Sequence, residues 1–455
     1  MIQIQPHRHL QFYLRPSIVH SPTSARSGRN NARQRVLSIV ASSSSSSSPP
    51  PSLPPPPQQQ QQRQGQWLQK ALAITALSTS LALSPYQFPG THHLEAQALL
   101  SSPSARQPRS PEAALRRSIP AFNLQVKEIQ QKLESVQFKL RIPQRKPWAA
   151  MQDDVAVAAR MVGTHPEEVL QGVLAPDRPQ AIQLVQEIQS DLDRLSTSIS
   201  LKDTDRTSVR VANALERLSA LELLQAPGLP YRLPQQYSDL PILTGRATIE
   251  FTVEKASGKA VFVNANSEQG PAARAVIAIT VDGYSAPITA GNFVRNVQMG
   301  VYANQKLLVN QDAIQIGAQG TSIGALPLEL MASDDFEPSY RIPLSVQSGE
   351  FPVLPLSIYG SVAMTHLPGA DASVGFVSSR QFFIYKYQRQ ASGLAGLSFD
   401  EGNFGVFGYV TKGAELLNKL EPGDVVVGAR VADGAEKLRL PTPNGADTTP
   451  TSSSS

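Results

Sequence analysis

The chain has 455 residues, 41 Lys plus Arg against 36 Asp plus Glu, a formal net charge of +5 and a pI near 9.3. It contains no Cys, which excludes disulfides, thiol catalysis and Cys-ligated metals. Only His165 and His366 lie beyond residue 98, which excludes a His-rich metal site there and leaves a Ser-His-Asp triad two candidate bases. We expect no metal and no cofactor.

The first 98 residues have the composition of a targeting signal in two parts. Eight basic residues precede the first acidic one, Glu95, in a segment rich in Arg, Ser, Pro and Gln, which is typical of organelle transit peptides. Lys70 then precedes an apolar run at 71–83, and small residues at 96 and 98 suit a signal peptidase. The run is too short to span a bilayer as a helix. We therefore predict a bipartite chloroplast transit and lumen-targeting peptide over residues 1–98.

An alternative for this segment is a disordered tail with one membrane-anchoring helix. No twin Arg precedes the apolar run, which favours a Sec-type route over the twin-arginine route. Beyond residue 98 the chain has 33 basic and 35 acidic residues, so the high pI belongs to the targeting segment. The charge is therefore no evidence for nucleic-acid binding. The remaining chain is long enough for two domains.

Residues 112–224 show helical periodicity. Apolar residues recur every three or four positions in two stripes, which comprise Val126, Ile129, Leu133, Val136 and Leu140, then Ile182, Val185, Ile188, Leu192, Leu195 and Ile199. Asp203 or Thr204 is expected to cap a third helix that ends at Leu224. Shorter helices are expected at 150–162 and 165–174. The pattern predicts a helical bundle whose stripes form its core rather than a face that binds a partner.

The pattern changes after residue 224. Residues 225–245 contain four prolines and predict an extended linker. From residue 246 apolar residues alternate with polar ones, which predicts strands at 246–255 and 273–283. A helix opening at Thr289 or Asn292 is expected to run to Met299. Further strands are expected near 360–364, 381–386 and 405–411, a last helix at 412–420, and a disordered tail at 441–455.

Three fragments resemble the marks of the cyclophilin family of peptidyl-prolyl isomerases. They are VDGYSAPITAGNF at 281–293, SRQFFIYKY at 379–387 and FGVFGYV at 404–410. Segments at 140–148, 222–237, 326–331 and 351–366 are similar to the multidomain cyclophilins of the thylakoid lumen. The resemblance covers residues 112–440.

This resemblance implies an α+β multidomain protein. An N-terminal helical bundle at 112–224 and a Pro-rich linker at 225–245 would precede a cyclophilin-like closed β-barrel with flanking helices at 246–440. It also implies a location in the chloroplast thylakoid lumen and a role in assembly or maintenance of photosystem II. The expected partners are Pro-containing segments of lumenal or thylakoid membrane proteins, photosystem II subunits among them. No nucleic-acid partner and no transmembrane span after removal of residues 1–98 are expected.

The active-site positions depart from the family pattern. Where active members carry Phe-His-Arg, this chain has Leu307, Leu308 and Val309. The resemblance assigns to that Arg a hydrogen bond toward the prolyl nitrogen, which Val309 cannot donate. Loss of one such donor commonly costs on the order of 2.7–4 kcal/mol of barrier reduction. By the same alignment Ile314 replaces an aromatic residue of the proline pocket and Gly317 replaces a substrate-binding Gln.

A peptide-binding groove is expected from what remains. Its expected members are Ile314, Met364, Gln381, Phe383, Phe399 and Phe404, the last replacing a His at the pocket rim. Phe407 is expected in the barrel core, and His366 is expected to be a solvated loop histidine rather than a catalytic base.

These departures favour a catalytically weak or inactive Pro-peptide-binding factor. The alternative is an active isomerase, in which Arg341 or Arg380 supplies the missing guanidinium from another loop. A third possibility places the working surface on the helical domain, or makes that domain a lid over the groove.

Overall fold

The structure is a computed structural model that describes residues 107–441, except 144, 264–269, 318–323, 334, 368–374, 389–396 and 399. The predicted targeting peptide and residues 442–455 of the predicted tail lie outside the described residues. Among the described residues, no helix is long and apolar enough to cross a membrane.

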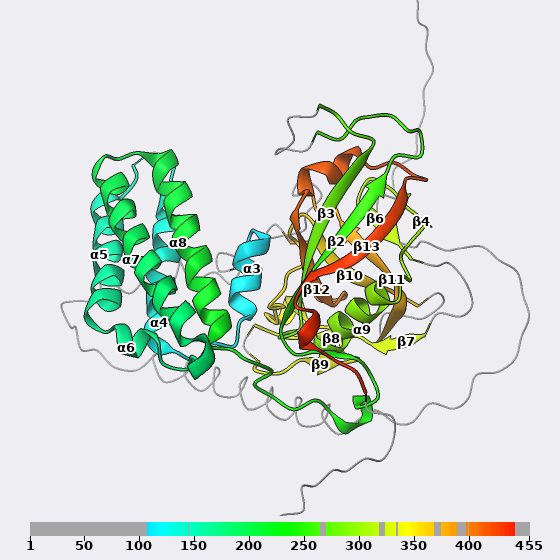
Figure 1. Ribbon diagram of the computed structural model, residues 1–455, viewed down its shortest axis with the longest axis horizontal. Helices are drawn as coiled ribbons and strands as arrows, with labels where there is room; N and C mark the ends of the chain where they lie inside the picture. The colour runs from blue at the N-terminus through cyan, green and yellow to red at the C-terminus, as the bar shows by residue number, and fades with distance from the viewer. Residues whose placement is uncertain are drawn as a thin grey trace, which may run out of the picture. The chain divides into compact units, whose positions relative to one another are not determined.

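Four helices form the predicted bundle (Figure 1). They are α4 (Leu124–Leu140), α5 (Trp148–Thr164), α7 (Arg178–Ser200) and α8 (Thr204–Leu224). Each packs against two others, in the ring α4–α5–α7–α8. Both predicted stripes are buried except for Ile182, which is 42% exposed. The helical bundle predicted from the periodicity is confirmed.

The bundle differs from prediction at its second short helix. α6 covers only Pro166–Val169, and Gly172 then adopts a positive φ of 93° before a 3₁₀ turn at Ala175–Asp177. The cap expected for the last bundle helix is present, because the Asp203 carboxylate accepts a hydrogen bond from the amide of Arg206 at 3.0 Å.

An antiparallel β-barrel follows the bundle. Its strands are β2 (Arg246–Glu254), β3 (Arg274–Asp282), β4 (Gln305–Lys306), β5 (Leu308–Val309), β6 (Ala313–Ile316), β7 (Ala325–Pro327), β10 (Ser361–His366), β11 (Phe376–Tyr385), β12 (Val406–Lys412) and β13 (Val425–Asp433). They pair in the order β4-β13-β2-β3-β12-β10-β11-β6-β5, with β7 also on β11. β4 and β5 lie at opposite ends of this order, yet only Leu307 separates them in sequence. This segment therefore pairs with both edges of the sheet and nearly closes the barrel.

Short pairs complete the barrel domain. β1 (Ile242–Leu243) pairs with β14 (Leu438–Arg439), and β8 (Glu329–Leu330) pairs with β9 (Ser339–Tyr340). Short 3₁₀ helices occupy Gln235–Tyr237, Val346–Ser348, Ala414–Lys419 and Ala435–Lys437. The helix expected at 412–420 is thus a six-residue 3₁₀ helix at Ala414–Lys419, and β13 was not predicted.

Five aromatic rings fill the barrel core, with neighbouring centroids 5.0 to 6.1 Å apart: Phe251, Phe293, Tyr302, Phe382 and Phe407. Phe407 is fully buried there, as expected. Helix α9 (Pro287–Gln298) packs against β1, β11 and β13 and begins earlier than predicted. No side chain at its N-cap satisfies its first amides. Instead the buried Glu329 carboxylate accepts from the amides of Ile288 at 3.3 Å and Thr289 at 2.9 Å.

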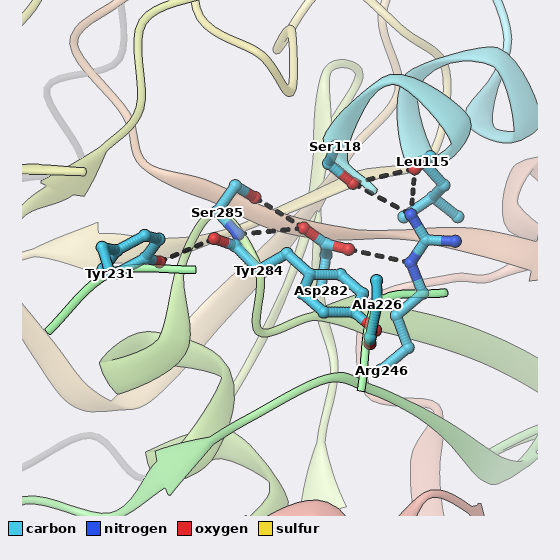
Figure 2. Close-up of polar contacts among 8 residues, drawn as sticks. All are labelled: Leu115, Ser118, Ala226, Tyr231, Arg246, Asp282, Tyr284 and Ser285. Carbon is cyan, nitrogen blue, oxygen red and sulfur yellow. Dashed lines mark hydrogen bonds and ion pairs between the residues drawn. The ribbon is translucent and has the colours of Figure 1, made fainter. Parts of the chain in front are cut away.

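A polar network joins the barrel to the short helix α3 (Pro111–Ser118) and to the linker. We call it the junction network; its members are Leu115, Ser118, Ala226, Tyr231, Arg246, Asp282, Tyr284 and Ser285 (Figure 2). The Arg246 Nε donates to Asp282 at 2.8 Å, and its Nη2 donates to the Leu115 carbonyl and to Ser118 Oγ. The second Asp282 oxygen accepts from the amide and the hydroxyl of Ser285, at 3.1 and 2.7 Å.

Two tyrosines extend the network to the linker. The Tyr231 hydroxyl donates to the Tyr284 carbonyl at 2.6 Å, and the Tyr284 hydroxyl donates to the Ala226 carbonyl at 2.8 Å. The Arg246 guanidinium also lies 5.9 Å from the centre of the Tyr284 ring. Two of the recognised fragment's polar residues, Asp282 and Ser285, therefore act in holding α3 to the barrel.

Helix α3 also contacts the bundle. Its buried Arg116 pairs with Glu134 of α4 at 3.3 Å and donates to Ser219 of α8 at 3.1 Å. On the other side, Ala114 and Leu115 belong to a buried apolar cluster with the barrel residues Tyr409 and Val406. α3 is thus tied by side chains to both the bundle and the barrel.

Candidate functional site

One row of side chains crosses the barrel strands on the face that carries Phe383. The strand register places Leu308 opposite Gln315, Gln315 opposite Phe383, Phe383 opposite Ala363, and Ala363 opposite Val406. Directly paired residues project to the same face of a sheet. Phe383 is 7% exposed and packs in a cluster separate from the barrel core. This row lies on the outer face of the barrel, where the predicted groove residues are expected.

Phe404 covers this face from the loop that precedes β12. Its ring lies 5.1 Å from that of Phe383 in an edge-on arrangement, and 4.5 Å from the imidazole of His366. The buried carboxylate of Glu401 holds the loop by accepting from the amides of Leu356 and Ser357, at 2.7 and 2.9 Å. Burial raises the pKa of Glu401 above its ordinary value. The three rings are therefore in contact in series, with Phe404 between Phe383 and His366.

His366 differs from the solvated loop residue that we expected. It is the last residue of β10, is only partly exposed, and pairs with Val377 across a register shift. Both ring nitrogens are buried, and neither has a hydrogen-bond partner of ordinary geometry among the described residues. Burial lowers the pKa of His366, against smaller raising effects from the backbone of Phe376 and Asn403 and from Asp400. The neutral ring is therefore favoured.

The other predicted groove residues separate into two groups. Gln381 is 6% exposed. Its backbone amide donates to Ser378 Oγ at 2.9 Å, and its backbone carbonyl accepts from the Thr365 hydroxyl at 3.4 Å. Ile314 and Met364, at 0% and 1% exposure, lie instead in the main core cluster, where Ile314 is paired with Ile384. Phe399 lies outside the described residues. The structure thus brings Phe383 and Phe404 into contact but does not place Ile314 or Met364 beside them.

The surroundings of Val309 and Gly317 account for the residue type at each position. Val309 is half-buried on β5, paired with Ile314 and packed against the core cluster. Gly317 has a φ of 122°, and a Cβ there would lie 2.3 Å from the carbonyl oxygen of Arg380. A side chain such as the family Gln therefore does not fit at Gly317 without movement of the backbone.

The two arginines considered as substitutes lie elsewhere. Arg380 is exposed, in the stretch of β11 where the Arg380 amide donates to Ser378 Oγ. The Arg341 guanidinium lies over the ring of Phe376, with its carbon 4.4 Å from the ring centre. Among the described residues, no contact is found between either guanidinium and Phe383 or Phe404.

Gln315 was missed by the sequence reasoning. It occupies the position beside Phe383 that we had assigned to its neighbour Ile314, and it is partly exposed. Its Oε1 is buried and has no hydrogen-bond partner among the described residues. An amide oxygen is a hydrogen-bond acceptor, so the Gln315 Oε1 beside Phe383 can accept from an N–H group.

Comparison with known families matches most of the chain outside the targeting segment. Residues 110–224 match a family model described as the PsbQ-like domain of peptidyl-prolyl cis-trans isomerase CYP38-like proteins. Residues 269–435 match the cyclophilin-type peptidyl-prolyl cis-trans isomerase model.

Relatives that align with most of the chain are also named peptidyl-prolyl cis-trans isomerases. The chain is 44% identical to Arabidopsis thaliana "Peptidyl-prolyl cis-trans isomerase CYP37, chloroplastic", over 77% of this chain and 75% of that one. It is 30% identical to the "Putative thylakoid lumen peptidyl-prolyl cis-trans isomerase sll0408" of Synechocystis, over 81% and 93% of the two chains. Arabidopsis CYP38, also named chloroplastic, is 26% identical over 75% and 77%. These names confirm the predicted location, the thylakoid lumen of the chloroplast.

Proposed function

The chain belongs to the cyclophilin-type peptidyl-prolyl isomerases of the chloroplast and thylakoid lumen, and we propose that it binds Pro-containing peptides with weak or no isomerase activity. The single observation that carries this proposal is Val309. An isomerase must stabilise a twisted amide against a barrier of about 18–20 kcal/mol. Val309 offers that amide neither charge nor hydrogen-bond donor.

The surroundings of Phe383 support retention of binding. Phe383 and Phe404 present two aromatic rings at right angles, a suitable enclosure for a proline ring. Because Phe383 is only 7% exposed, a proline ring reaches it when the half-buried Phe404 moves aside. The Gln315 Oε1, which has no hydrogen-bond partner among the described residues, and the His366 ring, which the backbone of Phe376 and Asn403 approaches, then face the peptide backbone. A neutral amide and a neutral imidazole suit peptide N–H and C=O groups.

The biological role follows from the same proposal. We propose an assembly or maintenance factor for photosystem II that holds lumen-exposed, Pro-containing segments of its subunits. Residues 1–98 would direct the chain to the lumen and then be removed. This partner class rests on the resemblance to multidomain lumenal cyclophilins.

The test compares binding with catalysis on the same purified protein. A fluorescent neutral peptide with a central Ala-Pro bond should bind more tightly than its Ala-Ala counterpart in an anisotropy titration. In a protease-coupled assay the isomerisation rate should stay at background while an active cyclophilin accelerates the same substrate. Phe383→Ala should abolish the preference for proline, and Phe138→Ala, at a half-exposed position on α4, should leave it unchanged.

The alternative is an active isomerase, favoured by the family to which the chain belongs. A rate close to that of the active control would establish the alternative. Equal affinity for the Pro and Ala peptides would contradict the binding proposal itself.

A further inference from the structure

Arg341 has no acidic partner among the residues that the structure describes. Among the described residues its side chain makes no ion pair, and its buried Nε has no hydrogen-bond partner. Three other arginines in the barrel do have such partners: Arg246 pairs with Asp282, Arg274 with Glu254 and Arg430 with Glu250. A partly buried guanidinium without an anion retains part of its desolvation cost.

The structure nevertheless holds this guanidinium in one place. Its central carbon lies over Phe376, 4.4 Å from the ring centre. Its backbone has a positive φ of 63°, unusual for a residue with a Cβ, and its amide donates to the Leu328 carbonyl at 2.7 Å. Gly375 is packed so closely against it that a Cβ there would lie 2.2 Å from the Arg341 carbonyl oxygen. An arginine fixed by stacking loses little freedom when it binds an anion.

One candidate for a counter-charge, Glu329, is already engaged. Glu329 and Arg341 both act on the pKa of Tyr237, so the two groups share a neighbourhood. The Glu329 carboxylate accepts from the first amides of α9, and burial raises its pKa to about 7. No ion pair joins it to Arg341 in the described part of the chain. The guanidinium is therefore available to an external carboxylate.

Arg341 is also close to the aromatic site. β10 advances two residues, from Met364 to His366, while the opposite positions on β11 change by five, from Phe382 to Val377. Because of this register shift, His366 is paired with Val377. Phe376 is the residue next to Val377 and therefore lies near His366. His366 in turn contacts Phe404, and Phe404 contacts Phe383. Strand pairing therefore places Phe376, and the Arg341 guanidinium over it, one residue along β11 from the partner of His366.

We propose that Arg341 is a specificity-determining residue that binds an acidic side chain a few residues from the bound proline. This inference rests on the proposed peptide-binding function and names its preferred peptide class, Pro-containing segments with a nearby Asp or Glu. His366 lies between the two subsites. An extended peptide spans about 3.3–3.6 Å per residue, so two to five residues connect them.

The experiment measures charge preference separately from proline binding. Fluorescent peptides with one Ala-Pro bond carry Glu at two, three, four or five positions on either side of the proline, each with a matched Gln peptide. At low ionic strength, the best-placed Glu peptide should bind wild-type protein about five- to tenfold more tightly than its Gln match. The preference should decline when salt is added.

Variants identify the residue that is responsible. Arg341→Gln should equalise the Glu and Gln peptides, and Arg341→Lys should keep part of the preference because the charge remains. Arg274→Gln removes one positive charge from an exposed pair on β3 and should leave the preference intact. Should Arg341→Gln fail to fold, the salt dependence of wild type still decides the matter.

Two results would overturn the inference: equal affinity of wild type for every Glu and Gln pair, or an unchanged preference in Arg341→Gln. Either can occur while neutral Pro peptides still bind better than Ala peptides. Loss of that discrimination would instead contradict the proposed function.

Discussion

The junction network and the surroundings of Phe383 use similar residues in opposite ways. At the junction, Arg246, Asp282 and Ser285 satisfy one another and the backbone of α3 (Figure 2). Beside Phe383, buried atoms of Gln315 and His366 have no partner of ordinary geometry in the described structure. Completed polar networks hold parts of a protein together, whereas incomplete ones lose stability unless a ligand completes them. On the function that we propose, the junction residues support the fold and those beside Phe383 face a bound peptide.

The largest effect is expected at the junction. Arg246→Ala leaves the fully buried carboxylate of Asp282 without its cation, which typically costs 3–5 kcal/mol. Denaturant unfolding of the whole protein should show this loss. Arg274→Ala breaks an exposed pair with Glu254 and should cost about 0–1 kcal/mol. Equal losses in the two variants would contradict the importance given to the junction.

A carboxyl group near the junction makes stability depend on pH. Glu222 of α8 is 2% exposed, its Oε2 has no partner among the described residues, and burial raises its pKa to about 8. Arg116, Arg246 and Lys127 oppose that increase, while Glu134 adds to it.

The sign follows from proton binding. Between the ordinary pKa of 4.5 and about 8, the folded protein keeps a proton on Glu222 that the unfolded chain releases. Glu222 therefore makes the free energy of unfolding fall as pH rises through this window, by a few kcal/mol at most. Buried Glu329, whose pKa is raised to about 7, acts in the same direction. Unfolding titrations at several pH values should show a smaller decline for Glu222→Gln; an identical decline would exclude Glu222 as a source.

The smallest effect on stability is expected beside Phe383, where a substitution should stabilise the protein rather than destabilise it. Gln315→Met removes a buried Oε1 that has no partner among the described residues and inserts an apolar side chain of similar length, so it should stabilise the free protein by about 1 kcal/mol. The same variant should bind the neutral Pro peptide several-fold more weakly. The matched control is Gln225→Met: its Oε1 also has no partner among the described residues, but its Nε2 donates to the carbonyls of Val169 and Gln171 at 2.8 and 2.9 Å. That control should destabilise the protein, and destabilisation by both variants would refute the distinction.

The helical domain could be predicted because spacing alone determines which helix face is buried. The stripe from Val126 to Leu140 is buried at every position, and the Asp203 cap is local in sequence. Distant contacts could not be predicted in this way. The first amides of α9 are satisfied by Glu329, some forty residues later. β13 was missed because most of its residues are partly exposed, so the alternation is weak.

The candidate site was only partly predictable for a related reason. Phe383 belongs to a recognisable fragment, but the face to which a neighbouring strand presents its side chains depends on register. A change of one residue reverses every side chain in a strand. The alignment named Ile314, whereas the strand pairing puts Gln315 beside Phe383. His366 required knowledge of the Phe404 loop, and Arg341 required the register shift between β10 and β11.

The most direct test of the central claim is the isomerisation rate of the purified protein beside Val309→Arg and an active cyclophilin. We predict a background rate for wild type and a measurable gain for Val309→Arg, since one restored donor is worth on the order of 10²–10³ in rate. Wild type should at the same time bind the Ala-Pro peptide more tightly than the Ala-Ala peptide. A wild-type rate close to that of the active control would contradict the account and show that another residue supplies the missing charge.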